Sequence, residues 1–439
     1  MVFRRRATRS LGEPRCAEKA SENLPRENYM PPASSSMLER PVSKQGTASL
    51  RWVAVSIFVI SSTLNYLDRA LIATLAPLVM AEMHFNQTQF GYLLSAFSIT
   101  YAASSLAAGW FLDRVGVTRG ISAAVSWWSA AAVATGLVRS VGGLTVCRAA
   151  LGIGESAGVP AVGKLNGVYL KPEERALGAA LNQIGLSVGL SIAPLCIGLA
   201  MARGWRTPFI LTGLLGFLWI PLWWLVERRI APAYEPAPRR EPQQRWSTIL
   251  LNRNLILLVI ANVLWMGSYS LWSNWTTLYL MRIHGLTLEQ TAKYTWIPPL
   301  ISNLGGFFGG WLSLRWMRQR ISAISARRKA VWVSAFGSCI SLLLVFSPDV
   351  QWTTVLISLS FFFALAGSVN IYALPIDIFG PARAGLAIAA LTCAFGLMQT
   401  AISPLIGFLS DHRLYSGVVW IVTLPLLLSA LVLNQLRER

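Results

Sequence analysis

Charged side chains are scarce in this sequence, and acidic ones are half as common as basic ones. Only 13% of the 439 residues are Asp, Glu, Lys or Arg, whereas 54% are hydrophobic. Soluble globular domains carry about 25% charged residues. The composition therefore excludes an ordinary water-soluble protein and places the chain in a bilayer.

Cysteine and histidine are also rare, which limits the chemistry available. The five cysteines form no CxxC motif and no pair with metal-ligand spacing, so we interpret them as small core residues. The three histidines fall in predicted loops, away from the middle of the membrane. There is no nucleotide-binding loop and no soluble catalytic domain. The sequence therefore predicts a protein that is not an enzyme and that uses no metal and no organic cofactor.

Long hydrophobic runs are what the sequence has in abundance. A bilayer core about 30 Å thick is crossed by about 20 helical residues, and backbone polar groups in lipid must be satisfied within each segment. Runs of this length predict twelve helical spans, namely 51–76, 89–112, 120–138, 143–168, 175–200, 207–227, 254–281, 294–314, 330–347, 352–376, 383–409 and 415–436.

The formal net charge of +19 is unevenly distributed. Most Lys and Arg residues lie in the N-terminal tail, in the loops after even-numbered spans and at the C-terminus. The loops after odd-numbered spans hold only Arg139, Arg203, Arg206, Arg282, Lys293 and Arg413. This asymmetry follows the positive-inside rule and predicts that both termini are cytoplasmic. We therefore expect the lipid bilayer, and no nucleic acid, to be the partner of the basic side, and a cell-membrane location, the inner membrane in a bacterium.

Two polar stretches divide the chain. Residues 1–48 lack an apolar core and predict a disordered basic cytoplasmic tail, and the Pro-rich basic segment 228–252 predicts a cytoplasmic linker. Between and after them lie an N-terminal bundle, 49–227, and a C-terminal bundle, 253–439. The two bundles show internal sequence similarity, since "GLSVGLSIAPLCIG" (185–198) resembles "GLMQTAISPLIG" (396–407). Duplicated six-helix halves are typical of secondary transporters that alternate between inward-open and outward-open states.

Besides Arg51 and Lys164, which lie near the ends of the first and fourth spans, four ionisable residues lie further inside these two spans. They are Asp68, Arg69, Arg148 and Glu155. One charge at the bilayer centre costs about 2.5–3.5 kcal/mol on insertion scales, so such residues are usually functional. Arg148 and Glu155 are seven residues apart and share a helix face. Two acids and two bases sum to zero charge, which a low-dielectric interior tolerates if they pair.

Protonation of either acid would leave this cluster net positive and release an arginine for an organic anion. Arginine presents a planar fork that matches a carboxylate. The sequence therefore predicts symport of a small organic anion with protons, the proton being the coupling ion. A permanent salt-bridge network that only orients the helices is the alternative, and an anion exchanger or an efflux protein remains open.

Neutral polar residues are candidates for the rest of a substrate site. Asn65 lies one turn from Arg69, with Tyr66 beside it, although both could be satisfied core residues. The interiors of the last six spans contain no ionisable side chain but offer amides. The candidates in this class are Gln183, Asn274, Asn370 and Gln399. Amides suit hydroxyl groups, which favours a sugar acid; several tryptophans leave aromatic and dicarboxylic acids as alternatives.

Several motifs resemble a known family. "GWFLDRVGVTRG" (109–120) is similar to the loop between the second and third helices of the major facilitator superfamily. "NYLDR" (65–69), "CRAALGIGESAGVPAVGKL" (147–165) and "YLKPEERALGAALNQIG" (169–185) resemble its anion:cation symporter family, which includes hexuronate, galactonate and glucarate permeases. The resemblance covers about residues 50 to 436.

The resemblance implies a fold and a division of labour. It implies an all-α membrane protein of twelve transmembrane helices in two six-helix bundles, acting as a monomer. It implies that Asp68 and Glu155 carry protons, that Arg69 contacts the substrate carboxylate and that Arg148 is the switching partner. In the loop motif we expect Asp113 and Arg119 to form a cytoplasmic gate.

Overall fold

The computed structural model describes residues 48–171, 174–229, 250–347 and 349–437. All of them belong to one compact unit, Pro41–Arg439. The predicted tail 1–48 and most of the predicted linker 228–252 lie outside the described residues. The helices on either side of this linker end at Glu227 and begin at Arg253, where the sequence predicts the ends of the two bundles.

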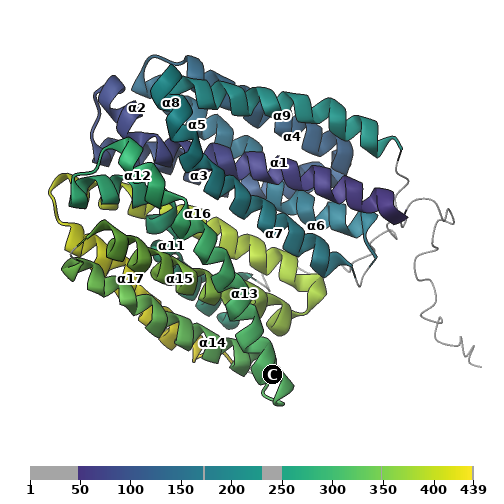
Figure 1. The fold of residues 1–439 in the computed structure, drawn as a ribbon. Helices are drawn as coiled ribbons and strands as arrows, with labels where there is room; N and C mark the ends of the chain where they lie inside the picture. The colour runs from purple at the N-terminus through teal and green to yellow at the C-terminus, as the bar shows by residue number, and fades with distance from the viewer. Residues whose placement is uncertain (1–47, 172–173, 230–249, 348, 438–439) are drawn as a thin grey trace, which may run out of the picture. The chain divides into compact units, whose positions relative to one another are not determined.

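The described residues fold into helices alone (Figure 1). In chain order these are α1 (Ala48–Thr74), α2 (Ala76–Met83), α3 (Gln87–Val115), α4 (Val117–Leu137), α5 (Val141–Glu155), α6 (Gly158–Tyr169), α7 (Arg175–Ile192), η1 (Ala193–Leu195), α8 (Cys196–Arg203), α9 (Arg206–Glu227), α11 (Arg253–His284), α12 (Leu288–Thr295), α13 (Ile297–Arg318), α14 (Ala323–Ser338), η2 (Cys339–Phe346), α15 (Val350–Phe379), α16 (Pro381–Asp411) and α17 (Tyr415–Leu433).

Nine helical stretches of the described residues are long and apolar enough to cross a membrane. The three other predicted spans coincide with α3, with α5 plus α6, and with α13. The all-helical architecture is confirmed, whereas the count of twelve spans stays a prediction.

The fourth predicted span, 143–168, is interrupted directly after Glu155. Pro160 has no N–H group, so the carbonyl group of Ser156 lacks its usual helical donor four residues later. The Ser156 hydroxyl donates to the Ile153 carbonyl oxygen, 2.7 Å away. The chain continues through right-handed helical angles into α6. The break therefore places a local irregularity beside the buried acid.

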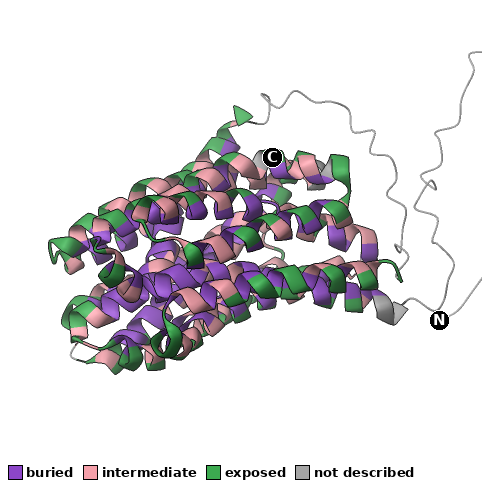
Figure 2. Ribbon diagram, turned by 90° about the horizontal axis from the view of Figure 1, so that it is seen from above, coloured by how far each residue is buried: buried purple, intermediate pink, exposed green. Residues whose placement is uncertain are grey.

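Each half of the chain has a hydrophobic core of its own. One cluster contains Ala54 and Phe58 from the first half of α1, and another contains Leu255 and Leu258 from the first half of α11. Buried and exposed residues alternate along the helices around these cores (Figure 2).

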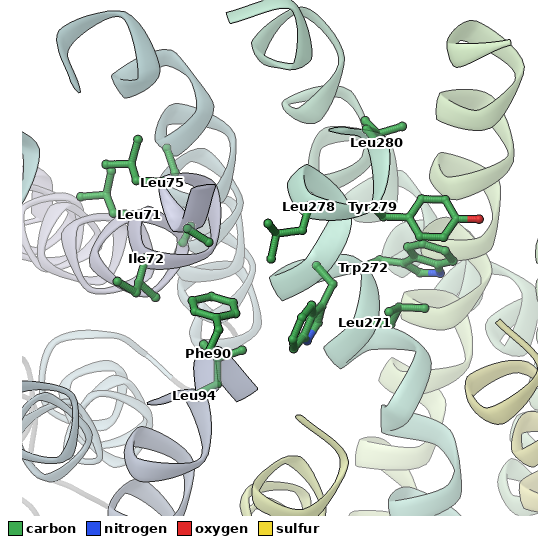
Figure 3. Packing of buried hydrophobic residues seen from close by; sticks show 14 of the residues in the cluster. Leu71, Ile72, Leu75, Phe90, Leu94, Leu271, Trp272, Leu278, Tyr279 and Leu280 are labelled. Carbon is green, nitrogen blue, oxygen red and sulfur yellow. The ribbon is translucent and has the colours of Figure 1, made fainter. Parts of the chain in front are cut away.

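A third cluster joins the two halves. It contains residues from the second half of α1, such as Leu71, and from the second half of α11, such as Trp272 (Figure 3). Between them Phe90 of α3 meets Trp275 of α11 edge to face, with ring centroids 5.4 Å apart. The halves therefore share a core at the end of the bundle where α1 ends, which we call the joined end, and have separate cores where α1 begins.

The joined end is also held by polar contacts between α3 and α16. The Asp411 carboxylate accepts from the backbone nitrogens of Gln87 and Thr88, at 3.1 and 2.9 Å, and from the Thr88 hydroxyl at 2.6 Å. These nitrogens belong to the first turn of α3, which has no helical acceptor for them. A negative charge at this terminus also complements the helix dipole.

Gly407 allows this close approach. A Cβ atom at Gly407 would lie 2.8 Å from the Cα atom of Thr88 and 2.7 Å from the carbonyl carbon of Gln87. Both are backbone atoms, so α3 could accommodate the methyl group only by moving as a whole. Close packing of α3 on α16 therefore requires glycine at this position.

We expect Gly407→Ala to lower the stability of the purified protein by about 1–3 kcal/mol, the usual cost of overpacking. Thermal unfolding in detergent measures the effect. Gly385→Ala on the same helix is the matched control, because a Cβ atom there meets nothing within 4 Å. Equal melting temperatures for the two variants would contradict the proposed packing constraint.

Candidate functional site

The four ionisable residues singled out in the sequence lie in the interior, on α1 and α5. Arg69 Nε forms an ion pair with Glu155 Oε2. The Glu155 side chain is fully buried and that of Arg69 is 20% exposed. The expectation that the two helices bring acid and base together is confirmed for this pair.

Three aromatic rings surround the guanidinium group of Arg69. Its Cζ atom lies 4.9 Å from the ring centroid of Tyr66, 5.1 Å from that of Phe97 and 4.5 Å from that of Tyr101. Aromatic faces attract cations, most strongly where water is excluded. The rings therefore help to hold the charge through the faces of the guanidinium group, while its Nε atom pairs with Glu155 at the edge.

Asp68 and Arg148 do not form the second direct pair. Arg148 is 1% exposed, and its Nε and Nη2 atoms have no hydrogen-bond partner among the described residues. Both carboxylate oxygens of Asp68 are likewise unpaired within the described chain. Thr212 lies beside Asp68, but its hydroxyl donates to the Phe209 carbonyl oxygen at 3.2 Å. Asp68 and Glu155 act on Arg148 only through space.

A cavity of about 80 Å³ lies between the two halves next to these charges. One wall carries Arg69 and Arg148, and the opposite wall carries Asn274 of α11 and Gln399 of α16. Neither Asp68 nor Glu155 lines it. The cavity therefore presents two guanidinium groups on one side and neutral amides on the other, which suits an anion that also carries hydroxyl groups.

Sequence analysis did not identify several residues that line this cavity. They are Phe97, Tyr269, Ser273, Leu94, Leu190 and Phe395. Phe97 and Tyr101 stand four residues apart on α3, and Tyr269, Ser273 and Asn274 share a face of α11. This spacing was visible in the sequence, but only the packing shows that both faces point toward Arg69.

Two predicted substrate residues lie away from the cavity. Gln183 is exposed and lines a separate apolar crevice of about 460 Å³ between α7 and α13. Asn370 is fully buried on α15, and its Nδ2 atom donates to the carbonyl oxygens of Gly309 and Ala366, at 3.0 and 2.9 Å. In this structure the two amides do not share a pocket with Arg69, because helix rotation directs them elsewhere, and their role as substrate contacts stays a prediction.

Asn65 and Tyr66 differ in position although they are adjacent. Tyr66 lines the cavity between the halves, whereas Asn65 faces a smaller cavity on the other side of Arg69. Of the predicted gate, Arg119 is exposed at the start of α4, and the side chain of Asp113 lies outside what the structure describes. The gate stays a prediction.

Comparison with known proteins gives consistent matches. A sequence profile described as Major Facilitator Superfamily matches residues 58–326. The hexuronate transporter of Escherichia coli K12 is 26% identical over 404 residues, covering 88% of this chain and 93% of that protein. The probable sulfoacetate transporter SauU of Cupriavidus necator is 26% identical over 380 residues, covering 82% and 88%.

A solved structure shares the fold. It is the crystal structure of a bacterial homolog of the human lysosomal transporter Spinster, in an inward-facing and unoccupied conformation. The two chains are 18% identical, with a TM-score of 0.69 over 89% of this chain and 96% of that one. The similarity extends over both halves.

The contrast between two asparagines gives a test of the cavity. We expect Asn370→Ala to lower stability by about 1–2 kcal/mol, because it removes two buried hydrogen bonds. Asn274 bonds only within its own helix, to Ser270 and Ser273, so Asn274→Ala should alter substrate affinity more than melting temperature. Thermal unfolding and ligand titration separate the two. A higher ligand Kd for Asn370→Ala with an unchanged melting temperature would contradict its structural role.

Proposed function

Because the chain belongs to the Major Facilitator Superfamily and is a multi-pass membrane protein, we propose that it is a secondary active transporter that imports a sugar acid together with protons. The observation that carries the proposal is the buried Arg69–Glu155 ion pair at the wall of the cavity between the halves. Arg69 lines the cavity, whereas its acidic partner does not.

The cavity chemistry supports an organic anion as substrate. Arg69 and Arg148 provide positive charge without a neighbouring acid in the lining, and a guanidinium group binds a carboxylate with two parallel hydrogen bonds. Asn274, Ser273 and Gln399 offer donors and acceptors for hydroxyl groups on the opposite wall. A sugar acid carries both kinds of group, and similarity to a hexuronate transporter supports this class.

A small dianion is the second candidate. Two arginines on one wall would also suit a solute with two acidic groups, and the chain is similar to a probable sulfoacetate transporter. Such a solute has no sugar hydroxyls to occupy Asn274 and Gln399. A thermal-shift comparison of hexuronates, sulfoacetate and phthalate separates the candidates, since only a sugar acid should lose its stabilising effect in Asn274→Ala.

Proton coupling follows from the ion pair. An ionised Glu155 holds Arg69, and a protonated Glu155 releases it to the substrate. The coupling is reciprocal, so a bound anion raises the affinity of Glu155 for a proton as much as the proton raises that for the anion. Asp68 and Arg148 form the second acid and base of the same cluster.

Transport requires the two halves to separate in turn at each end. We propose twelve spans with both termini in the cytoplasm, so that the joined end faces outward. The shared core and the Asp411 contact then close the outer side. The cavity of about 80 Å³ is far below the roughly 300–1,000 Å³ of typical ligand sites, so it must widen when a substrate enters.

The central test is Glu155→Gln in proteoliposomes. The amide cannot ionise, so Arg69 should stay available at every pH and substrate exchange should remain measurable. Accumulation driven by a pH gradient should be lost. Accumulation equal to that of the unaltered protein would rule out Glu155 as the proton carrier, and exchange without any pH-driven uptake in the unaltered protein would identify an exchanger.

Arg69→Lys tests the substrate contact. Lysine keeps the charge but cannot form two parallel hydrogen bonds to a carboxylate, so binding should weaken by about 1.5–3 kcal/mol, or roughly ten- to a hundredfold. Isothermal titration of the purified variant measures the loss. An unchanged Kd would place the carboxylate elsewhere.

A further inference from the structure

A second cavity lies on the far side of Arg69 from the substrate cavity. It has a volume of about 30 Å³ and is enclosed by α1, α4, α5, α6 and α7. Only Tyr66 and Arg69 line both cavities. Glu155 and Asn65 line this one alone. The ion pair therefore separates the substrate cavity from a smaller polar one, which the proposed function leaves without a role.

Two buried polar atoms in the lining have no partner. They are Nδ2 of Asn65, a residue 4% exposed, and Oε1 of Glu155, a residue fully buried, and neither finds a hydrogen bond within the described residues. The neighbouring hydroxyl groups of Ser61 and Ser62 already donate hydrogen bonds to other acceptors. Ser61 donates to the Phe58 carbonyl oxygen at 2.7 Å, and Ser62 donates to Asn182 Oδ1 at 2.6 Å. One unpaired donor and one unpaired acceptor thus belong to residues that line the same small cavity.

Water is the ligand that this pair of atoms fits. A cavity needs about 10–15 Å³ to hold one water molecule, and buried waters bridge polar groups that lack protein partners. One water can accept from Asn65 Nδ2 and donate to Glu155 Oε1. A metal ion suits the site poorly, because the Arg69 guanidinium is a cation and the Asn65 amide nitrogen is a hydrogen-bond donor that cannot ligate a metal. No group of three metal-ligating side chains occurs in the described part of the chain.

The polar lining points away from the joined end. Ser61, Ser62, Asn65 and Arg69 follow one face of α1 at helical spacing. Ser62 lies about 10 Å before Arg69 along the helix axis, toward the end where α1 begins. Asn182 of α7 extends the same polar stripe. Under the proposed topology this is the cytoplasmic direction, so these polar side chains lie on the cytoplasmic side of the Arg69–Glu155 pair and away from the substrate cavity.

We propose that this cavity is a proton-release site, in which water held by Asn65 takes the proton of Glu155 on the cytoplasmic side. In the release step the O–H bond at Glu155 Oε1 breaks, the water oxygen binds that proton and passes one on toward the cytoplasm, and the Glu155 carboxylate pairs with Arg69. Asn65 is then a positioning residue and not a substrate contact. The inference rests on the proposed proton coupling.

Several other groups act on Glu155 and have to be held constant in any test. Arg69 and Arg148 favour its ionised form, and Asp68 and Tyr66 lie close enough for their charges to interact with it. None of them is altered by a change at Asn65 or at the apolar lining residue Val162 of α6.

The test compares Asn65→Leu with Asn274→Ala in proteoliposomes. Asn65→Leu has a similar volume but cannot bind water, so proton-driven accumulation should slow by about tenfold more than substrate exchange does, which is less than the roughly 10²–10⁴-fold expected for loss of the proton-transfer group itself. The rate ratio between H₂O and D₂O should rise, and the substrate KM should stay near that of the unaltered protein. Asn274→Ala should instead raise KM without changing the isotope ratio. Asn65→Ser, which can hold water, should restore much of the accumulation rate.

Val162→Phe keeps the proposal testable if Asn65→Leu does not fold, because it fills the cavity without removing a polar group. It should give the same rise in isotope ratio. A raised KM in Asn65→Leu with an unchanged isotope ratio, or normal accumulation in Val162→Phe, would overturn the proton-release site. Failure of the unaltered protein to accumulate any anion would instead overturn the proposed function.

Discussion

The ion pair between Arg69 and Glu155 is the interaction on which the rest of the site depends. Either charge alone would be costly in the interior, because removing a single partner from a buried pair costs about 3–5 kcal/mol. The pair is stable only while both are ionised, or once a new anion or a proton replaces one partner. The rings of Tyr66, Phe97 and Tyr101 reduce the cost of holding the guanidinium group during that exchange. A buried pair of this kind can act as a switch and not only as a support.

The arrangement of the hydrophobic clusters allows the two halves to move relative to each other around this ion pair. A shared core and a capped helix terminus hold the halves together where α1 ends, while separate cores serve the two halves where it begins. Rigid halves with separate cores can rotate as units, because their internal packing does not change when the contact between them does. Arg69 and Glu155 both belong to the N-terminal half, whereas Asn274 and Gln399 belong to the other. A substrate held by Arg69 and the amides therefore contacts both halves, so its binding can change how the two halves pack against each other.

The sequence predicted the helical stretches and the buried charged residues better than it predicted the directions in which neutral side chains point. Bilayer thickness and the cost of buried charge are strong constraints, so the helical stretches and the importance of Asp68, Arg69, Arg148 and Glu155 follow from the residues alone. Which side a neutral amide faces is a weaker constraint, since each residue turns a helix by about 100° and asparagine can satisfy itself on a backbone carbonyl. Gln183 and Asn370 lie outside the cavity for that reason. The aromatic shell of Arg69 could not be derived either, because it depends on how α3 packs against α1.

Charge balance in the cluster links the substrate to the number of protons. With both acids ionised, Asp68 and Glu155 cancel Arg69 and Arg148, and each bound proton leaves one positive charge uncompensated in a low-dielectric site. A solute with one carboxylate restores neutrality after one protonation, whereas a dianion requires two. Under the proposed function, the two acids of the cluster carry at most two protons per transport cycle. Glu155 is paired with Arg69, whereas Asp68 lacks any hydrogen bond within the described residues. Under the proposed function, a proton on Asp68 leaves the Arg69–Glu155 pair intact, so a solute with one carboxylate can bind Arg69 only when the single proton is on Glu155.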